Sequence, residues 1–363
     1  MFSRRAHWFA PVNELTLERR KREELFDLTE TNPTRAGLPY PHDALADAMA
    51  RGARATYDPD PRGLRSAREA LAEHLRCDAD DLILTASTSE AYSFLFKLLC
   101  DPGDAVLTAT PSYPLLEHLA SLELVELRTF PLEFHKRWEL HDVPLTERTH
   151  AIVVVNPNNP TGSFVSAREQ DALASHGVPI ISDEVFLDYP LDGSGTTFVR
   201  DDVLTFTLGG LSKSAGLPHF KLGWIRVSGP KKREALEALE LIADNFLSVA
   251  TPVQVALPEI LTLAPQIRNA IRARTRRNLD ALRAAAPNAV TVLPVEGGWS
   301  AVLRVPRVMS DEAFALAALD RGVVVQPGFF FDFAQEGFVV LSLLTREDVF
   351  AEGVRRLLDM IPA

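Results

Sequence analysis

The chain has 363 residues, of which 46% are hydrophobic and 24% charged, as in an ordinary globular protein of about two or three domains. Its formal net charge of -11 argues against nucleic-acid binding, which depends on clustered lysine and arginine. Cys77 and Cys100 show no paired spacing, so neither a disulfide framework nor a metal site is expected. No apolar run is long enough to cross a membrane, and the N-terminus does not resemble a secretory signal, so we expect a cytoplasmic protein.

The first forty residues predict an arm rather than a domain. Residues 15–26 are amphipathic, and residues 31–39 are rich in turn-forming Asn, Pro and Gly. We expect residues 1–40 to form an N-terminal arm that contributes to a smaller C-terminal domain.

Residues 41–265 predict a large domain in which helices alternate with short apolar strands. Runs of Val, Ile and Leu without polar alternation are typical of strands buried on both faces of a parallel sheet. The fold class is therefore α/β, with a mainly parallel sheet between helices. The expected strands are residues 81–85, 105–108, 125–130, 151–155, 179–181, 203–208 and 222–227, and the expected helices are 64–75, 89–99 and 231–246.

Residues 266–363 predict the smaller domain, of α+β type. Its expected helices are residues 266–285, 311–321 and 346–360, and its expected strands are residues 290–293 and 300–304. The boundary at residue 265 is placed inside a long helix.

Three polar residues each follow a predicted strand of the large domain. Asn159 stands in Asn-Pro-Thr-Gly, Asp183 ends an apolar run, and Lys213 follows the strand at residues 203–208. Taken singly, they read as a turn residue, a paired structural carboxylate and a solvated lysine. In open parallel sheets, however, ligands bind beyond the carboxyl ends of the strands. An amide, a carboxylate and an amine in this order along the chain are the groups that hold pyridoxal phosphate (PLP).

The segments 156–162, 182–184, 212–216 and 222–224 resemble the class I/II aminotransferases, PLP enzymes of fold type I, and the resemblance extends over about residues 32–357. It implies transfer of an amino group from an amino acid or amine to a keto acid, in a homodimer. It also implies that Lys213 forms an imine with the cofactor and shuttles a proton. Asp183 would bind the pyridine N–H, and Asn159 would donate to the ring phenolate.

The resemblance assigns further cofactor contacts. Thr88 and Ser89, where a strand gives way to a helix, would hold the phosphate, although an ordinary helix cap explains them equally. Tyr113 would stack on the ring, with a core aromatic as the alternative. Lys221 stands where an arginine usually grips the phosphate. Tyr57 would reach the phosphate of the neighbouring subunit, or face solvent in a loop.

The substrate side departs from the family. Val340 stands where an arginine usually binds the substrate carboxylate, so common α-amino acids are expected to react poorly. Arg35 and Arg346 are candidate replacements, each with a solvated surface arginine as the alternative. Gly37 and Trp299 complete the expected substrate site, although a core tryptophan is equally plausible.

Two more departures concern the cofactor. Phe186 replaces a tyrosine that donates to the phenolate, and Gly210 replaces a phosphate-binding serine. These changes keep open a PLP-dependent lyase, acting by β-elimination or decarboxylation, and a degenerate relative without catalysis. A ligand-sensing regulator is disfavoured, because the arm is too short to be a DNA-binding domain and the chain is acidic.

Overall fold

The computed structural model describes residues 3, 5, 12–141 and 143–361, and its centre is an eight-stranded sheet. Four neighbouring pairs in the middle of the sheet are parallel, and β9, β2 and β5 join it antiparallel. The α/β class predicted from the sequence is therefore confirmed. In sheet order the strands are β2 (Leu82–Thr85), β9 (Gly223–Ser228), β8 (Thr205–Gly210), β7 (Ile180–Asp183), β6 (Thr149–Val155), β3 (Ala105–Thr110), β4 (Glu126–Phe134) and β5 (Trp138–Leu140).

Helices cover both faces of this sheet because successive apolar side chains point to opposite sides. In β6, Val153 packs in the cluster that holds helices α4 (Thr88–Leu99), α5 (Leu115–Leu122) and α8 (Lys232–Asp244). The next residue, Val154, packs on the opposite side in the cluster that includes α6 (Ala167–Ser175). Both faces are buried, which explains the continuous apolar runs of the sequence.

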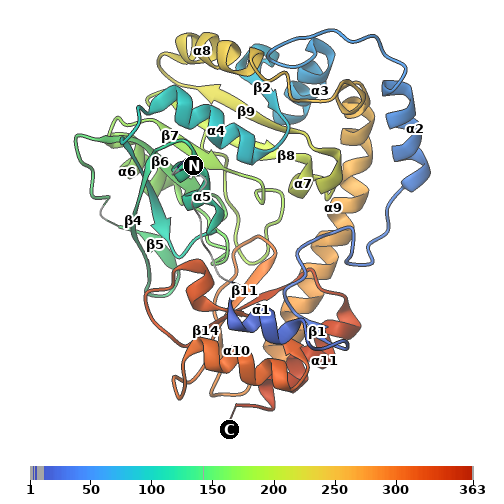
Figure 1. Cartoon of the computed structure of the whole chain (residues 1–363), viewed down its shortest axis with the longest axis vertical. Helices are drawn as coiled ribbons and strands as arrows, with labels where there is room; N and C mark the ends of the chain where they lie inside the picture. Colours follow the sequence, from blue (N-terminus) through green and yellow to red (C-terminus); the bar gives the residue numbers. More distant parts are fainter. Residues whose placement is uncertain (1–2, 4, 6–11, 142, 362–363) are drawn as a thin grey trace.

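A second, four-stranded antiparallel sheet lies in the segment where the sequence predicts a smaller domain, shown in orange and red in the lower part of Figure 1. The N-terminal arm joins it, because Phe26 pairs with Val323 and α1 packs on α10. The elements are α1 (Glu14–Arg19), β1 (Phe26–Asp27), β10 (Thr291–Val292), β11 (Ser300–Arg304), α10 (Asp311–Asp320), β12 (Val323–Val324), β13 (Gln326–Pro327), η4 (Gly328–Phe331), β14 (Phe338–Ser342) and α11 (Glu347–Leu358).

Helix α9 (Thr251–Ala285) connects the upper and lower parts of the molecule (Figure 1). It begins well before the expected residue 266 and contains Pro258 and Pro265. Proline lacks a backbone N–H and is disfavoured in a helix interior, and for this reason the sequence did not predict the first half of α9 as helix. Packing against α2 (His42–Gly52) and α3 (Arg65–Leu75) overrides that preference. At the crossing with α2, a Cβ on Gly52 would lie 2.3 Å from the carbonyl oxygen of Pro252, so only glycine fits.

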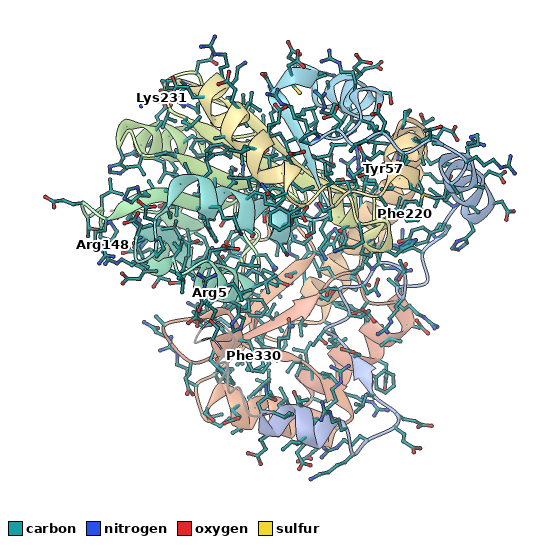
Figure 2. All side chains as sticks on the ribbon, turned by 45° about the horizontal axis from the view of Figure 1, so that its top comes forward. Arg5, Tyr57, Arg148, Phe220, Lys231 and Phe330 are labelled. Atoms are coloured by element: carbon teal, nitrogen blue, oxygen red, sulfur yellow. The ribbon has the colours of Figure 1, made fainter. Side chains whose placement is uncertain are left out.

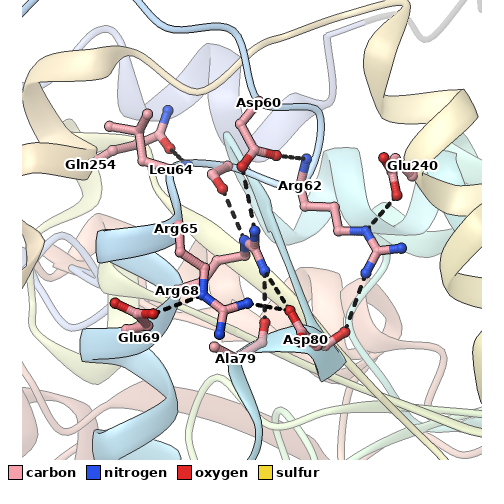
Figure 3. Close-up of polar contacts among 11 residues, drawn as sticks. Asp60, Arg62, Leu64, Arg65, Arg68, Glu69, Ala79, Asp80, Glu240 and Gln254 are labelled. Carbon is pink, nitrogen blue, oxygen red and sulfur yellow. Dashed lines mark hydrogen bonds and ion pairs between the residues drawn. The ribbon is translucent and has the colours of Figure 1, made fainter.

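The loop before α3 is fixed by one buried arginine. Arg68, which is 6% exposed, donates to the carbonyl oxygens of Gly63 and Ala79 at 2.9 and 3.0 Å and lies 3.4 Å from the Asp60 carboxylate (Figure 3). The guanidinium thereby satisfies buried carbonyl groups and holds the turn that follows Tyr57. In the described part of the chain, no helix is long and apolar enough to span a membrane.

Candidate active site

A cavity of about 630 Å³ opens beyond the carboxyl ends of β7 and β8, beside the start of α4. This volume lies in the range of small-molecule sites. Most of the residues that sequence reasoning selected lie on its wall: Thr88, Ser89, Tyr113, Asn159, Asp183, Lys213, Lys221 and Trp299.

Lys213 lies on the short helix α7 (Leu211–Ser214), directly after β8. Hydrogen bonds from distant segments fix the end of this helix. Tyr189 donates to the carbonyl of Lys213 at 2.5 Å, Arg268 to that of Ser214 at 3.0 Å, and Tyr40 to that of Gly216 at 2.7 Å. The base of the lysine side chain is therefore held in place by the core.

The Lys213 amine lies between aromatic rings, 5.2 Å from the centroid of Trp299 and 5.7 Å from that of Phe186. Burial lowers the pKa of Lys213, and the charge of Asp183 opposes this in part. Among the described residues, no hydrogen-bond acceptor is paired with Nζ. A buried amine with a lowered pKa is more often neutral, which makes it a better nucleophile and base.

Asp183 is held by its neighbours, but no described residue forms an ion pair with it. Its carboxylate accepts from the Tyr92 hydroxyl at 3.0 Å and from the Val185 N–H at 3.2 Å. Burial raises the pKa of Asp183 to about 6, while the two hydrogen bonds and the nearby Lys213 lower it in part. A protonated ring nitrogen placed here would supply the missing positive charge.

The three asparagines of the run 156–159 have different partners. Asn156 donates to the carbonyl of Thr196, and Asn158 donates to that of Pro111, both at 3.0 Å. Asn159 alone of the three lines the cavity, where its carbonyl oxygen accepts from the Ser300 hydroxyl at 3.4 Å. Its amide N–H₂ is left to donate to a ligand, as a ring phenolate requires.

The start of α4 offers a site for an anion. Ser87 caps the helix by accepting from the Glu90 N–H, so Thr88 and Ser89 occupy the first turn. The first N–H groups of a helix have no acceptor within the helix and attract phosphate. Gly210 lies next to Thr88, and the exposed Lys221 lines the same cavity.

Two aromatic residues of the cavity wall, Tyr113 and Trp299, differ in exposure. Tyr113 is 49% exposed at the cavity wall. Trp299 is 2% exposed and packs edge-on against Phe186 and Tyr189, with ring centroids 5.2 and 5.0 Å apart. Trp299 is thus a core residue and a cavity residue at once.

The structure does not bring every selected residue to the cavity. Tyr57 is 64% exposed in a separate shallow cleft with Leu247, distant from Phe330 in Figure 2. Arg35 and Gly37 are exposed in the arm, and neither lies on the wall.

Sequence reasoning missed other residues of the wall. Tyr92 lies one helical turn after Thr88 on α4, so the helical spacing could have indicated it. Gln326 gave no signal, because it stands in a two-residue strand of the smaller domain.

The residues present fit PLP. The cavity offers an amine, a buried carboxylate without a paired cation, a free amide donor and an anion site at a helix start. These four groups match the aldehyde, ring nitrogen, phenolate and phosphate of that cofactor.

Nearly the whole chain is similar to known aminotransferases. An aspartate/prephenate aminotransferase from Thermus thermophilus is 31% identical over 370 residues, covering 95% of this chain and 93% of that protein. Nicotianamine aminotransferase 1 from Oryza sativa subsp. japonica is 34% identical over 242 residues, and the match spans about half of that relative, 48%. An alanine aminotransferase from Pyrococcus furiosus has the same fold, with a TM-score of 0.88, 23% identity and 99% of each chain covered.

The sequence profile described as Aminotransferase class I and II matches residues 23–357. The resemblance stated from the motifs is thereby confirmed, and this chain belongs to the class I and II aminotransferases.

Proposed function

We propose that the protein is a PLP-dependent transaminase that moves an amino group from an amino acid or amine to a keto acid, with Lys213 as the residue that holds the cofactor. The observation that carries the proposal is the meeting of Lys213, Asp183 and Asn159 on one cavity wall, from three strand ends. When bound, PLP supplies an electron sink that stabilises negative charge on the substrate carbon.

The residues of the chain would share the remaining work. Lys213 Nζ, with its lowered pKa, would accept a proton from the substrate carbon and return it to the cofactor side. Asp183 would hold the proton on the ring nitrogen, and Tyr92 would keep that carboxylate ionised. Asn159 would donate to the phenolate. Thr88, Ser89 and Lys221 would bind the phosphate, and Tyr113 would stack on the ring.

The assignment of Lys213 is tested by borohydride reduction of protein purified with pyridoxal phosphate, followed by peptide mass mapping. The expected result is a reduced adduct on the peptide that contains Lys213, and none in the Lys213→Arg variant. An unlabelled Lys213 peptide from cofactor-saturated protein would refute the assignment.

The reaction type needs a separate measurement. In a transamination, the donor leaves as a keto acid and no ammonia appears, whereas β-elimination releases ammonia and decarboxylation releases carbon dioxide. Quantifying these products from one donor decides between a transaminase and a lyase. A labelled Lys213 with no product from any donor would instead indicate a degenerate relative.

We also propose a homodimer, in which Tyr57 reaches the phosphate held by the partner subunit. The exposure of Tyr57, Phe246 and Leu247 at 64%, 52% and 37% supports an interface on this side. Light scattering would give the mass, and Tyr57→Phe should weaken cofactor binding in a dimer but not in a monomer. The cytoplasm remains our prediction for the compartment.

A further inference from the structure

Beyond the groups that fit the cofactor, the wall of the cavity is largely apolar. Leu115, Leu116 and Leu119 come from α5 of the large domain, and Phe330 and Phe331 come from η4 of the smaller one. Figure 2 shows Phe330 where the lower part of the molecule meets the upper part. The two apolar surfaces are tied together, because the Ser112 N–H donates to the Phe331 carbonyl at 3.0 Å. A ligand in this part of the cavity would contact hydrocarbon and aromatic rings.

No arginine lines this cavity among the described residues, and its cations are Lys213 and Lys221, both assigned to the cofactor. At the position where relatives carry the carboxylate-binding arginine, Val340 is 1% exposed and packs with Val302 and Phe331 in one apolar cluster. Val340 therefore contributes hydrocarbon and no charge at this position.

The two candidate replacements do not fill the gap. The side chain of Arg346 pairs with Asp348 at 2.6 Å, and its stem lies against Gly37. Arg35 is exposed and stands off the cavity wall. Among the residues that the structure describes, therefore, no guanidinium lies on the wall of the cavity.

The neutral amide of Gln326 lies beside Val340, the position at which the charged arginine of the family is absent. Gln326 is the register partner of Val340 on the neighbouring strand, and it lines the cavity. Its side chain makes no hydrogen bond with another described residue, so both ends of the amide are left for a ligand. Thr31 and Ser300 are further neutral polar groups on the wall.

We propose that this cavity selects amino compounds with a bulky apolar body, and that Gln326 binds their polar head without regard to its charge. The substrates would be apolar amino acids or amines, and dicarboxylic amino acids would be excluded. This inference rests on the proposed transaminase function and specifies its substrate class.

The absence of an arginine clamp can be measured directly. A carboxylate gains roughly tenfold to two-hundredfold in affinity from a charged two-pronged partner, whereas a carboxamide cannot form that pair. The ratio of the two affinities therefore reports a clamp of any origin, including one from a second subunit.

The experiment measures the binding heats of unreactive ligands to the PLP-loaded protein. Phenylpropionate and phenylpropionamide carry the same apolar body, and succinate carries two carboxylates without it. We expect the first two to bind within about threefold of each other, and both at least about tenfold more tightly than succinate. A carboxylate that binds tenfold more tightly than its amide, tighter binding of succinate, or no binding of phenylpropionate would overturn the proposal.

Two variants locate the contacts. Phe330→Ala should lower the affinity for both aromatic ligands about tenfold. Phe329→Ala is the control, because the neighbouring Phe329 ring is 46% exposed and does not lie on the cavity wall, and it should change the two affinities less than about twofold. Gln326→Leu should weaken the amide and the carboxylate by the same factor. Equal effects of Phe330→Ala and Phe329→Ala, or a selective loss of the carboxylate in Gln326→Leu, would contradict the assignment.

Failure here is distinguishable from failure of the proposed function. If Lys213 is labelled with cofactor and succinate is the preferred ligand, only the substrate class is wrong. If Lys213 is not labelled, the transaminase proposal fails, whichever ligands bind.

Discussion

Gly210 offers the sharpest test of the phosphate site, because its replacement by serine should raise the affinity for PLP. Its φ of -179° is extended backbone that any residue adopts. A Cβ there would lie 3.4 Å from Gly223 Cα and from the carbonyl oxygen of Leu222, and 4.0 Å from the Thr88 Cγ2. These are ordinary contacts, so a serine fits without movement of its neighbours.

The expected gain follows from the position beside Thr88 at the start of α4. A hydroxyl that donates to a doubly charged phosphate makes a charge-assisted hydrogen bond, worth about 1.5–3 kcal/mol. We expect Gly210→Ser to bind PLP about tenfold more tightly than the wild type, near the lower end of that range.

The assay is fluorescence titration of the apoprotein with pyridoxal phosphate and, separately, with pyridoxal, which lacks the phosphate. Gly210→Ala is the matched control, since it adds the same Cβ without a hydroxyl. The serine variant should surpass the alanine variant for pyridoxal phosphate and equal it for pyridoxal. Equal affinity of the two variants for pyridoxal phosphate, or a gain that extends to pyridoxal, would show that the phosphate lies elsewhere.

Three further variants probe the acid, the phenolate and the fold. Tyr92→Phe removes a donor to Asp183 and should raise the pKa of that carboxyl group above about 6. The affinity for PLP, relative to the wild type, should then fall about threefold to tenfold near neutral pH and recover at alkaline pH. A loss of affinity that is independent of pH would mean that Tyr92 only packs against its neighbours. Phe186→Tyr adds a donor and should lower the pH at which the visible absorbance of the bound cofactor titrates, and an unchanged titration would count against a phenolate near this ring. Arg68→Leu strands two buried carbonyl groups and should reduce the free energy of unfolding by about 2–4 kcal/mol in denaturant titrations, whereas Arg65→Leu, at an exposed arginine, should have a small effect.

The central strands of the sheet, such as β6 and β8, could be predicted because they are buried on both faces and therefore read as apolar runs. The predicted strand at residues 300–304 matches β11 to the residue. The first half of α9 and the short strand β5 could not be predicted, since prolines mask the one and three residues are too few to show alternation in the other. The first half of α9 forms because it packs against α2 and α3, which are distant in sequence, and local propensity does not record such contacts. The strand β5 instead pairs with the neighbouring end of β4, Phe134 opposite Trp138.

The site divides in the same way. Lys213, Asp183 and Asn159 could be selected because each lies at or shortly after the end of a strand, and strand ends of a parallel sheet converge. Tyr92 and Gln326 reach the cavity by helix geometry and by strand register, which only the folded chain shows. The departure at Val340 and the missing carboxylate clamp could be read from the sequence, but the apolar surroundings could not, because the packing of Phe331 beside Val340 is a tertiary feature.

The energetics of Asp183 argue against a protein that has lost its cofactor. Its pKa rises from a usual 3.8 to about 6 on folding, so the unfolded chain releases the proton first as the pH rises. Between these two values the folded state becomes less stable with increasing pH, and about 2–3 kcal/mol is lost by neutrality. An asparagine would accept the Tyr92 hydroxyl without that cost, so packing alone gives no reason for a carboxylate here.

A bound pyridinium removes the cost by pairing with the charge. The stabilisation that PLP gives to the folded protein should therefore grow as the pH rises through about 4 to 6, and Asp183→Asn should reduce this growth to the part that comes from ionisation of the phosphate, while raising the stability of the apoprotein at neutral pH. Thermal unfolding of both proteins with and without cofactor across this pH range measures the effect. A cofactor stabilisation that is equally pH-dependent in Asp183→Asn would show that another group pairs with the ring.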